Sequence, residues 1–309
     1  MRKRQLGNSG LSVSVVGLGC NNFGGRIDAA SSRRVIDSAI EAGITFFDTA
    51  DIYGNQGGSE TIIGEALRGR RDRVIVATKF GMDMGDSLTE ARASRHYIRR
   101  ALEASLRRLQ TEYIDLYQLH IPDGLTPFEE TLAALTELVD EGKVRYIGSS
   151  QFTAWQVVDA DHIARRRHLE RFISAQNYYN LLGREAEREL LPACIAKGIG
   201  VLPFFPLAWG LLTGKYRRGQ PPPTGTRLAG GDERLTDANF DLLESLEGFA
   251  QERGHTLLDL AFAGLLARTP VASVIAGATR PEQIVANVAA GQWELTHEDH
   301  RAMRTLLAG

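Results

Sequence analysis

The sequence predicts an α/β fold of the (β/α)8 TIM-barrel type, with an N-terminal β-hairpin and extra C-terminal helices. Two observations favour this fold. Short apolar runs alternate with amphipathic helical segments along the chain, and they recur roughly every 30 residues, the length of one strand–helix unit. No segment between them has the composition of a domain linker. Eight such units favour a closed barrel, so residues 1–309 are expected to form a single domain.

The expected elements follow one another in order. Serines alternate with apolar side chains near the N-terminus, which indicates a hairpin leading into a first strand rather than a secretion signal. Ser31 or Ser32 is the expected cap of the first helix and Ser59 that of the second. The predicted strands are 15–17, 44–48, 74–79, 113–120, 144–149, 172–176, 199–204 and 271–276. The predicted helices are 31–41, 59–67, 94–108, 127–141, 153–168, 184–197, 237–253, 256–267, 281–290 and 296–307.

An open dinucleotide-binding sheet is the alternative fold. It requires a glycine-rich fingerprint after the first strand and an acid about 20 residues further on. Residues 17–22 read GLGCNN, so the third glycine is missing, and no acid ends a strand at that distance. The barrel therefore remains the favoured prediction.

Composition excludes several classes of function. The chain is 43% hydrophobic and 24% charged with a formal net charge of −2, so nothing suggests a nucleic-acid or membrane partner. No run approaches the roughly 18 apolar residues of a membrane span. Cys20 and Cys194 lie far apart, outside any metal-ligand spacing. We therefore expect a reduced, cytoplasmic protein without a metal site, and the oligomeric state stays open.

The strand–helix alternation pauses at residues 215–235. This segment is rich in Arg, Gly and Pro and contains three consecutive prolines. Loops near 20 residues are uncommon in compact domains and are usually functional or disordered. We expect residues 215–235 to be a long loop and a candidate lid.

Polar side chains stand at the ends of the predicted strands, where the loops of a barrel converge on one mouth. Asp48 ends the second strand and Tyr53 follows it, Lys79 ends the third strand, and His120 ends the fourth. Each residue alone is more typical of a cap or a packing position. Four ionisable groups of different type after three consecutive buried strands favour a functional site.

These four side chains point to proton transfer. Buried Lys79 needs Asp48 to stay charged, and its ammonium should lower the pKa of Tyr53 from its usual value of about 10. Tyr53 can then donate a proton, and His120 can hold an oxygen beside it. The set lacks a nucleophile and a metal site. Protonation of a developing alkoxide is therefore the natural task, with the hydride coming from a reduced nicotinamide.

Six motifs make the chain resemble the aldo-keto reductases over nearly its full length. They are DTADIYG at 48–54, ATK at 77–79, LH at 119–120, RYIGSSQF at 145–152, PLAWGLLTGK at 206–215 and IAGATRPEQ at 275–283. The resemblance implies a (β/α)8 barrel with NADPH/NADP across its mouth. It also implies that Tyr53, Lys79, Asp48 and His120 are the catalytic tetrad.

The resemblance further implies where the cofactor would bind. The expected contacts, ordered from the nicotinamide to the pyrophosphate, are Cys20, Asn21, Ser150, Gln151, Gln176, Phe204, Phe205, Pro206, Leu207, Lys215 and Arg227, the last reaching back from the lid. Gln151 replaces the Asn usual in the family, and Phe204 lacks the hydroxyl of a frequent Tyr. Candidate substrate-pocket residues are Phe23, the loop near Arg26, Asp123 and Trp209.

The segment Gly277 to Pro281 should accept the ribose phosphate that distinguishes NADPH from NADH. Pro281 suits a first helical position, so free backbone N–H groups would point at the loop. Thr279 offers a hydroxyl and Arg280 a planar fork suited to phosphate oxygens. Gln283 and Asn287 follow near the adenine, and Ala286 stands where relatives often carry an acid.

The resemblance favours NADPH-dependent reduction of an aldehyde or ketone to an alcohol, and it leaves the substrate open. One alternative is an NAD(P)-dependent sugar (aldose) dehydrogenase on the same scaffold. The other is an NADPH-binding regulatory subunit resembling the potassium-channel β subunits. The intact tetrad disfavours the regulatory subunit, because such subunits differ most at the position of His120.

Overall fold

The strands of the computed structural model form a small hairpin and one large sheet in the described part of the chain, residues 1–85 and 90–307. The hairpin pairs β1 (Lys3–Gln5) with β2 (Ser12–Ser14) in antiparallel register. The large sheet consists of β3 (Val16–Gly19), β4 (Phe46–Asp48), β5 (Ile75–Phe80), β6 (Ile114–Leu119), β7 (Val144–Ser150), β8 (Phe172–Tyr178), β9 (Gly200–Phe204) and β10 (Val274–Gly277).

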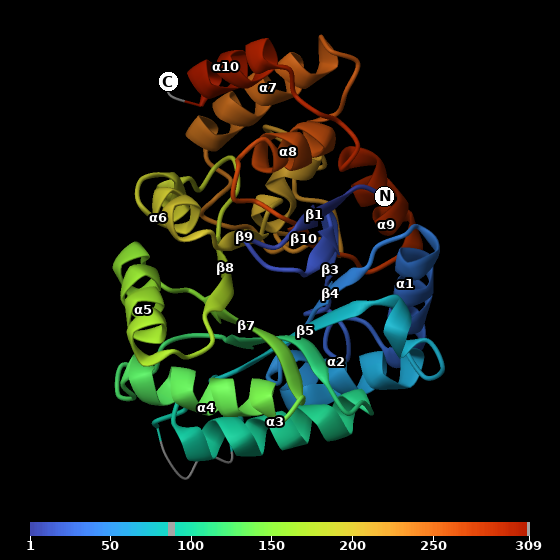
Figure 1. Ribbon diagram of the computed structural model, residues 1–309. Helices are drawn as coiled ribbons and strands as arrows, with labels where there is room; N and C mark the ends of the chain where they lie inside the picture. Colours follow the sequence, from blue (N-terminus) through green and yellow to red (C-terminus); the bar gives the residue numbers. More distant parts are fainter. Residues whose placement is uncertain (86–89, 308–309) are drawn as a thin grey trace.

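These eight strands are parallel and are ordered β10-β3-β4-β5-β6-β7-β8-β9. A further parallel bridge joins Val201 of β9 to Val271, just before β10, and brings the two edges of the sheet together. Figure 1 shows the resulting ring of strands with helices around it. The predicted barrel is confirmed.

Helices connect successive strands and cover the outside of the barrel (Figure 1). Because both faces of the barrel wall are covered, the strands are buried along most of their length, as expected for a parallel sheet. The α-helices are α1 (Ala29–Glu41), α2 (Tyr53–Ala66), α3 (Arg95–Leu109), α4 (Phe128–Asp140), α5 (Ala154–Arg167), α6 (Leu190–Lys197), α7 (Asp237–Gln251), α8 (Leu257–Leu266), α9 (Pro281–Ala290) and α10 (His297–Leu306). The short 3-10 segments are η1 (Arg71–Arg73), η2 (Glu185–Glu187) and η3 (Ala208–Thr213).

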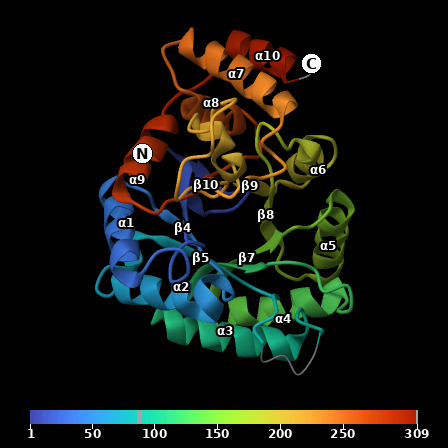
Figure 2. The same ribbon diagram turned by 180° about the vertical axis from the view of Figure 1, so that it is seen from behind.

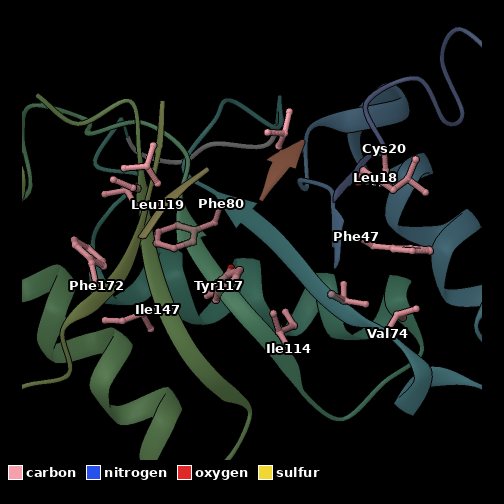
Figure 3. Packing of buried hydrophobic residues seen from close by; sticks show 14 of the residues in the cluster. Leu18, Cys20, Phe47, Val74, Phe80, Ile114, Tyr117, Leu119, Ile147 and Phe172 are labelled. Carbon is pink, nitrogen blue, oxygen red and sulfur yellow. Dashed lines mark hydrogen bonds between the residues drawn. The ribbon is translucent and has the colours of Figure 1, made fainter. Parts of the chain in front are cut away.

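The main core lies between the barrel wall and the surrounding helices. Figure 3 shows outward-facing side chains of this layer, among them Tyr117 of β6 and Phe80 of β5. Their ring centroids are 4.7 Å apart. A separate cluster inside the barrel joins Leu6 and Val13 of the hairpin region to interior residues such as Phe46 and Leu116. The hairpin thus covers the end of the barrel opposite the C-terminal ends of the strands.

The predicted extra helices at the C-terminal end are α7 and α10. They lie side by side beyond α8, outside the ring of barrel helices (Figures 1 and 2). With η3 and part of α8 they enclose their own apolar cluster, which includes Leu211, Phe240, Leu246 and Met303. No helix in the described ranges is long and apolar enough to cross a membrane.

Three predicted helix starts are wrong. The helix expected at 184–197 begins only at Leu190, as α6, after the 3-10 segment η2. The carboxylate of Asp28, not a serine, caps α1 by accepting the N–H of Ser31 at 2.7 Å. Ser59 does not cap α2, because its buried hydroxyl donates to the Cys20 carbonyl at 2.9 Å. Helix α2 instead begins at Tyr53, and residues 54–57 have non-helical dihedral angles. The sequence suggested a loop at Tyr53, but the residue lies at the start of an irregular helical segment.

Candidate active site

A cavity of about 620 Å³ opens where the strands end. Its lining contains Asp48 after β4, Tyr53 at the start of α2 and His120 after β6. Lys79 of β5 is fully buried and reaches these residues from behind the cavity wall. The structure therefore brings the four predicted catalytic residues together.

Lys79 is the centre of the tetrad. Its Nζ donates to Asp48 Oδ2 at 2.8 Å and to the Thr49 carbonyl at 2.8 Å, and it lies 3.5 Å from the Tyr53 hydroxyl. Asp48 is satisfied on its other oxygen, because Gln176 Nε2 donates to Oδ1 at 2.7 Å. The ion pair is thus held in place by neighbouring amides, as a buried charge pair requires.

The protonation states follow from burial and from these contacts. Burial alone would lower the pKa of Lys79, but Asp48 and Tyr53 together raise it above its usual value, so the ammonium is charged. Burial raises the pKa of Tyr53, and Lys79 only partly opposes this while Asp48 adds to it. The expectation of a lowered Tyr53 pKa is therefore wrong in its net direction. Tyr53 holds its proton firmly at neutral pH.

His120 is a neutral imidazole beside the tyrosine. Burial, followed by the charge of Lys79, lowers its pKa to about 3. The His120 and Tyr53 rings meet edge to face at 5.7 Å between centroids. The buried Nδ1 of His120 forms no hydrogen bond among the described residues. A substrate oxygen between these two rings can accept one hydrogen bond from each, which places a proton donor and a neutral holding group on the same atom.

The expected cofactor contacts line the same cavity. All of them are present there, namely Cys20, Asn21, Ser150, Gln151, Gln176, Phe204, Phe205, Pro206, Leu207, Lys215, Arg227, Gly277, Thr279, Arg280, Gln283 and Asn287. Gln151 has a left-handed backbone with φ of 57°, and its Nε2 donates to the His120 carbonyl at 3.1 Å. Their roles toward a cofactor remain predictions.

The cavity wall is strongly cationic. Arg26, Lys215, Arg227 and Arg280 all line it, and within the described residues its lining has one acid, Asp48, which is paired with Lys79. Burial lowers the pKa of Lys215, and the charges of the three arginines lower it further. A wall of this kind suits a ligand with several negative charges.

Residues 215–235 are a loop, as predicted, and polar contacts tie it down at both sides. Arg218 forms ion pairs with acids of α7, including Asp241 at 2.5 Å. On the other side, Arg227 Nη2 donates to Asn22 Oδ1 at 3.1 Å, and Arg26 Nη2 donates to the Gly225 carbonyl at 2.6 Å. The loop therefore reaches the segment after β3 and contributes to the cavity wall.

Helix α9 begins at Pro281, as the sequence predicts, and Arg280 precedes it as the N-cap. The Thr279 N–H and hydroxyl both donate to Gln283 Oε1, at 2.7 and 3.1 Å. Arg280 is 70% exposed, and its nearest acid, Glu282, is 3.9 Å away. Gln283 thus engages both Thr279 donors, and the exposed guanidinium of Arg280 is the group of this segment that is suited to a phosphate.

Two of the weaker pocket candidates do not belong to the cavity. Phe23 is fully buried in the main core. The Asp123 carboxylate accepts the backbone N–H groups of Ala93 and Thr126, both at 2.8 Å, and so stabilises its own loop. Arg26 and Trp209 do line the cavity.

Sequence reasoning missed several lining residues. Most of them lie beside a predicted strand end, inside a quoted motif or inside the predicted lid, whereas Leu258 lies in α8 and had no such signal. They are Gly19, Asn22, Gly210, Thr213, Thr224, Gly225, Thr226, Leu258, Ile275 and Ala276.

The chain is similar to known proteins over nearly its whole length. A family model described as "Aldo/keto reductase family" matches residues 15–308. A Bacillus subtilis (strain 168) protein described as uncharacterized oxidoreductase YrpG is 39% identical, and the match covers 100% of this chain and 97% of that protein. A probable voltage-gated potassium channel subunit beta of Oryza sativa subsp. japonica is 36% identical, and the match covers 94% of this chain and 91% of that protein. The L-glyceraldehyde 3-phosphate reductase of Escherichia coli (strain K12) is 37% identical, and the match covers 94% of this chain and 87% of that protein.

Proposed function

Because the chain belongs to the aldo/keto reductase family, we propose that it reduces an aldehyde or ketone to an alcohol, with NADPH as hydride donor and Tyr53 as proton donor. The observation that carries this proposal is the contact of the buried Lys79 ammonium with both Asp48 and the Tyr53 hydroxyl. An acid supported in this way, beside neutral His120 in one cavity, is suited to protonate a substrate oxygen.

Each residue of the tetrad has a separate task in this reaction. Tyr53 gives its proton to the substrate oxygen as negative charge develops there, and Lys79 stabilises the phenolate left behind. Asp48 keeps Lys79 charged and fixes its position. His120 donates a hydrogen bond to the same oxygen and orients the carbonyl. When bound, the reduced nicotinamide supplies the hydride to the carbonyl carbon, and solvent restores the tyrosine proton.

The cavity residues fit NADPH better than NADH. The pyrophosphate is anionic, and the ribose phosphate of NADPH adds up to about two further negative charges at neutral pH. Four cationic side chains, Arg26, Lys215, Arg227 and Arg280, line the cavity without an unpaired acid among the described residues. NADH would leave part of this positive charge without a counter-charge. The charge balance therefore supports NADPH.

The alternatives make different predictions for the same assay. A sugar dehydrogenase would turn over NADP with an aldose faster than it would reduce simple aldehydes. A regulatory subunit, which the potassium-channel relative brings into consideration, would bind NADPH with negligible turnover. The assembled tetrad with His120 in contact with Tyr53 supports catalysis.

The proposal is tested by following NADPH absorbance with purified protein and a panel of substrates. The panel contains 4-nitrobenzaldehyde, glyceraldehyde and a methyl ketone for reduction, and glucose and xylose with NADP for oxidation. We expect reduction of at least one carbonyl with a kcat in the usual range of about 1–10³ s⁻¹. Turnover confined to the sugars would favour the dehydrogenase, and tight NADPH binding with no turnover would favour the regulatory subunit.

A further inference from the structure

A second buried polar cluster lies between the barrel and helices α2 and α3, outside the cavity. Glu60 of α2 is fully buried, and its Oε2 accepts the Arg108 Nε–H of α3 at 2.7 Å. Its Oε1 accepts the Thr78 hydroxyl of β5 at 2.5 Å. Asp51 lies in the same cluster and is 1% exposed. Tyr117 of β6, labelled in Figure 3, lies near the cluster, because burial and then the charges of Asp51 and Glu60 raise the pKa of its hydroxyl.

This cluster contacts both chain segments that carry the proposed catalytic pair. Asp51 precedes Tyr53 by two residues, and its N–H donates to the Lys79 carbonyl at 3.0 Å. Thr78, which bonds Glu60, is the neighbour of Lys79 in β5. Any displacement of the cluster would therefore move the Tyr53 hydroxyl and the Lys79 ammonium relative to each other.

Arg108 also supports the irregular turn that follows Tyr53. Asn55 and Gln56 have φ of 59° and 63°, a left-handed conformation that is costly for residues other than glycine. At Gly57, a Cβ would lie 2.5 Å from Arg108 Cδ, so the arginine stem packs directly against the backbone of the turn. Such a strained turn persists only where its surroundings hold it, and Arg108 provides that support.

The cluster is electrically balanced only when one of its acids carries a proton. Glu60 has two good partners, whereas neither Asp51 oxygen has a donor at bonding geometry among the described residues, although the Ile52 N–H lies nearby. Burial, followed by the charge of Glu60, raises the pKa of Asp51 to about 8, against the opposing charges of Arg108 and Lys79. The proton therefore resides on Asp51 at neutral pH.

We propose that Asp51 and Arg108 are positioning residues for Tyr53, and that the protonated form of Asp51 keeps the cluster neutral and the turn in place. Loss of that proton leaves a net negative charge beneath the turn, and turnover falls. This inference rests on the proposed function, because it concerns the placement of the tyrosine that donates the proton.

The pH dependence of kcat can isolate Asp51 because the neighbouring groups titrate elsewhere. The pKa of His120 is lowered to about 3, and the pKa of Tyr53 and of Lys79 is raised above the usual value. Burial raises the pKa of Cys20 as well. A fall in kcat centred near pH 8 would therefore report Asp51.

The experiment measures kcat and the NADPH Kd from pH 6 to 9.5 for the wild type, Asp51→Asn, Arg108→Met and Arg108→Lys. Wild-type kcat should fall by about tenfold per pH unit above pH 8, and Asp51→Asn should remove this fall. Arg108→Met should lower kcat roughly tenfold or more at every pH with an unchanged NADPH Kd, and Arg108→Lys should restore part of it. The control is Asp115→Asn at the start of β6, an equally buried acid far from Tyr53, which should keep the wild-type profile.

An alkaline limb that is identical in wild type and Asp51→Asn would overturn this inference. If Arg108→Met fails to fold, the nearly isosteric Asp51→Asn still decides it. The proposed function fails separately, through a Tyr53→Phe variant that keeps full turnover. An inactive Tyr53→Phe together with an unchanged Asp51→Asn profile therefore rejects only the positioning role.

Discussion

The proposed chemistry depends at the scale of single residues on Lys79, which bonds to Asp48 and contacts Tyr53 from a fully buried position. A lone buried lysine would lose its proton. Here Asp48 keeps it charged, and Gln176 in turn holds Asp48. In the proposed reaction Lys79 would therefore stabilise the phenolate from within the barrel.

Lys79→Met should abolish most turnover. The substitution removes the charge that opposes the burial of Tyr53, so the pKa of the tyrosine should rise further and kcat should fall roughly 10²–10⁴-fold. Steady-state kinetics across pH provide the measurement, and NADPH binding checks that the protein is folded. An unchanged profile at nearly full rate would show that Lys79 only closes the strand end.

Asp51→Asn should stabilise the protein at neutral pH. The folded-state pKa of Asp51 is raised to about 8, against about 3.9 in the unfolded chain. The protonated carboxyl contributes fully to the free energy of unfolding below about pH 4. This contribution is lost as the pH rises to about 8, by up to about 1.4 kcal/mol per pH unit. Asparagine keeps the shape without this loss.

Urea unfolding at pH 5, 7 and 8 measures the effect. The stability advantage of Asp51→Asn over wild type should grow as the pH rises through this series. Asp115→Asn provides the contrast. The Asp115 carboxylate forms ion pairs with Arg71 and Arg145, so its replacement by an amide should destabilise the protein. A stability difference between Asp51→Asn and wild type that does not change with pH would contradict a protonated Asp51.

The sequence could name the four residue types of the tetrad because they stand at strand ends, which fixes their direction in a barrel. It could not give the net pKa shift of Tyr53. That shift depends on how deeply the tertiary structure buries the phenol, and burial outweighs the charge of Lys79. The bond between Gln176 and Asp48 was equally hidden, since 128 residues separate them.

At the scale of elements, the loop 215–235 has two differently anchored limbs. Arg217 and Arg218 pair with acids of α7, including Glu247 and Glu244. The second limb instead meets the segment after β3 through Arg227. A bound cofactor would touch the second limb, because residues 224–227 line the cavity.

Limited trypsin digestion should therefore respond to NADPH only in the second limb. We expect NADPH to slow cleavage after Arg227 by roughly fivefold or more, and cleavage after Arg217 or Arg218 to change little because ion pairs already hold these residues. Mass spectrometry of the early fragments identifies each cut. Equal cleavage after Arg227 with and without NADPH would argue against a cofactor-covering lid.

The segment between β10 and α9 should decide between NADPH and NADH. Arg280→Ala removes the exposed guanidinium at the start of α9, so it should raise the KM for NADPH roughly tenfold or more and leave the KM for NADH nearly unchanged. Initial rates with both cofactors measure this. Equal effects on the two, or equal use of both by the wild type, would reject the phosphate site.

Periodicity located the elements, but their starts depended on contacts that the sequence does not display. Asp28 takes the cap expected of a serine. The left-handed turn after Tyr53 extends from Gly54 to Gly57 over Asn55 and Gln56, two residues that are not glycine, and Arg108 from another helix supports it. Local patterns could not reveal a conformation that tertiary packing imposes.

At the scale of the whole molecule, eight repeated units predicted the barrel because strands and helices of that length alternate and close in one way. The resemblance placed Arg227 and the loop near Arg26 at the mouth, but the contacts that join them could not be predicted, since a loop from the last third of the chain crosses to the first. Barrel topology brings both segments to the same mouth and creates the cationic wall on which the cofactor proposal rests.

The central claim, Tyr53-dependent reduction of a carbonyl by NADPH, is tested most directly by comparing wild type with Tyr53→Phe. Phenylalanine keeps the ring and removes the proton. With 4-nitrobenzaldehyde, or the best carbonyl of the panel, kcat should fall at least roughly 10²–10⁴-fold, while the NADPH Kd measured by fluorescence should stay within about twofold. A Tyr53→Phe variant whose kcat remains within about threefold of wild type would contradict the account.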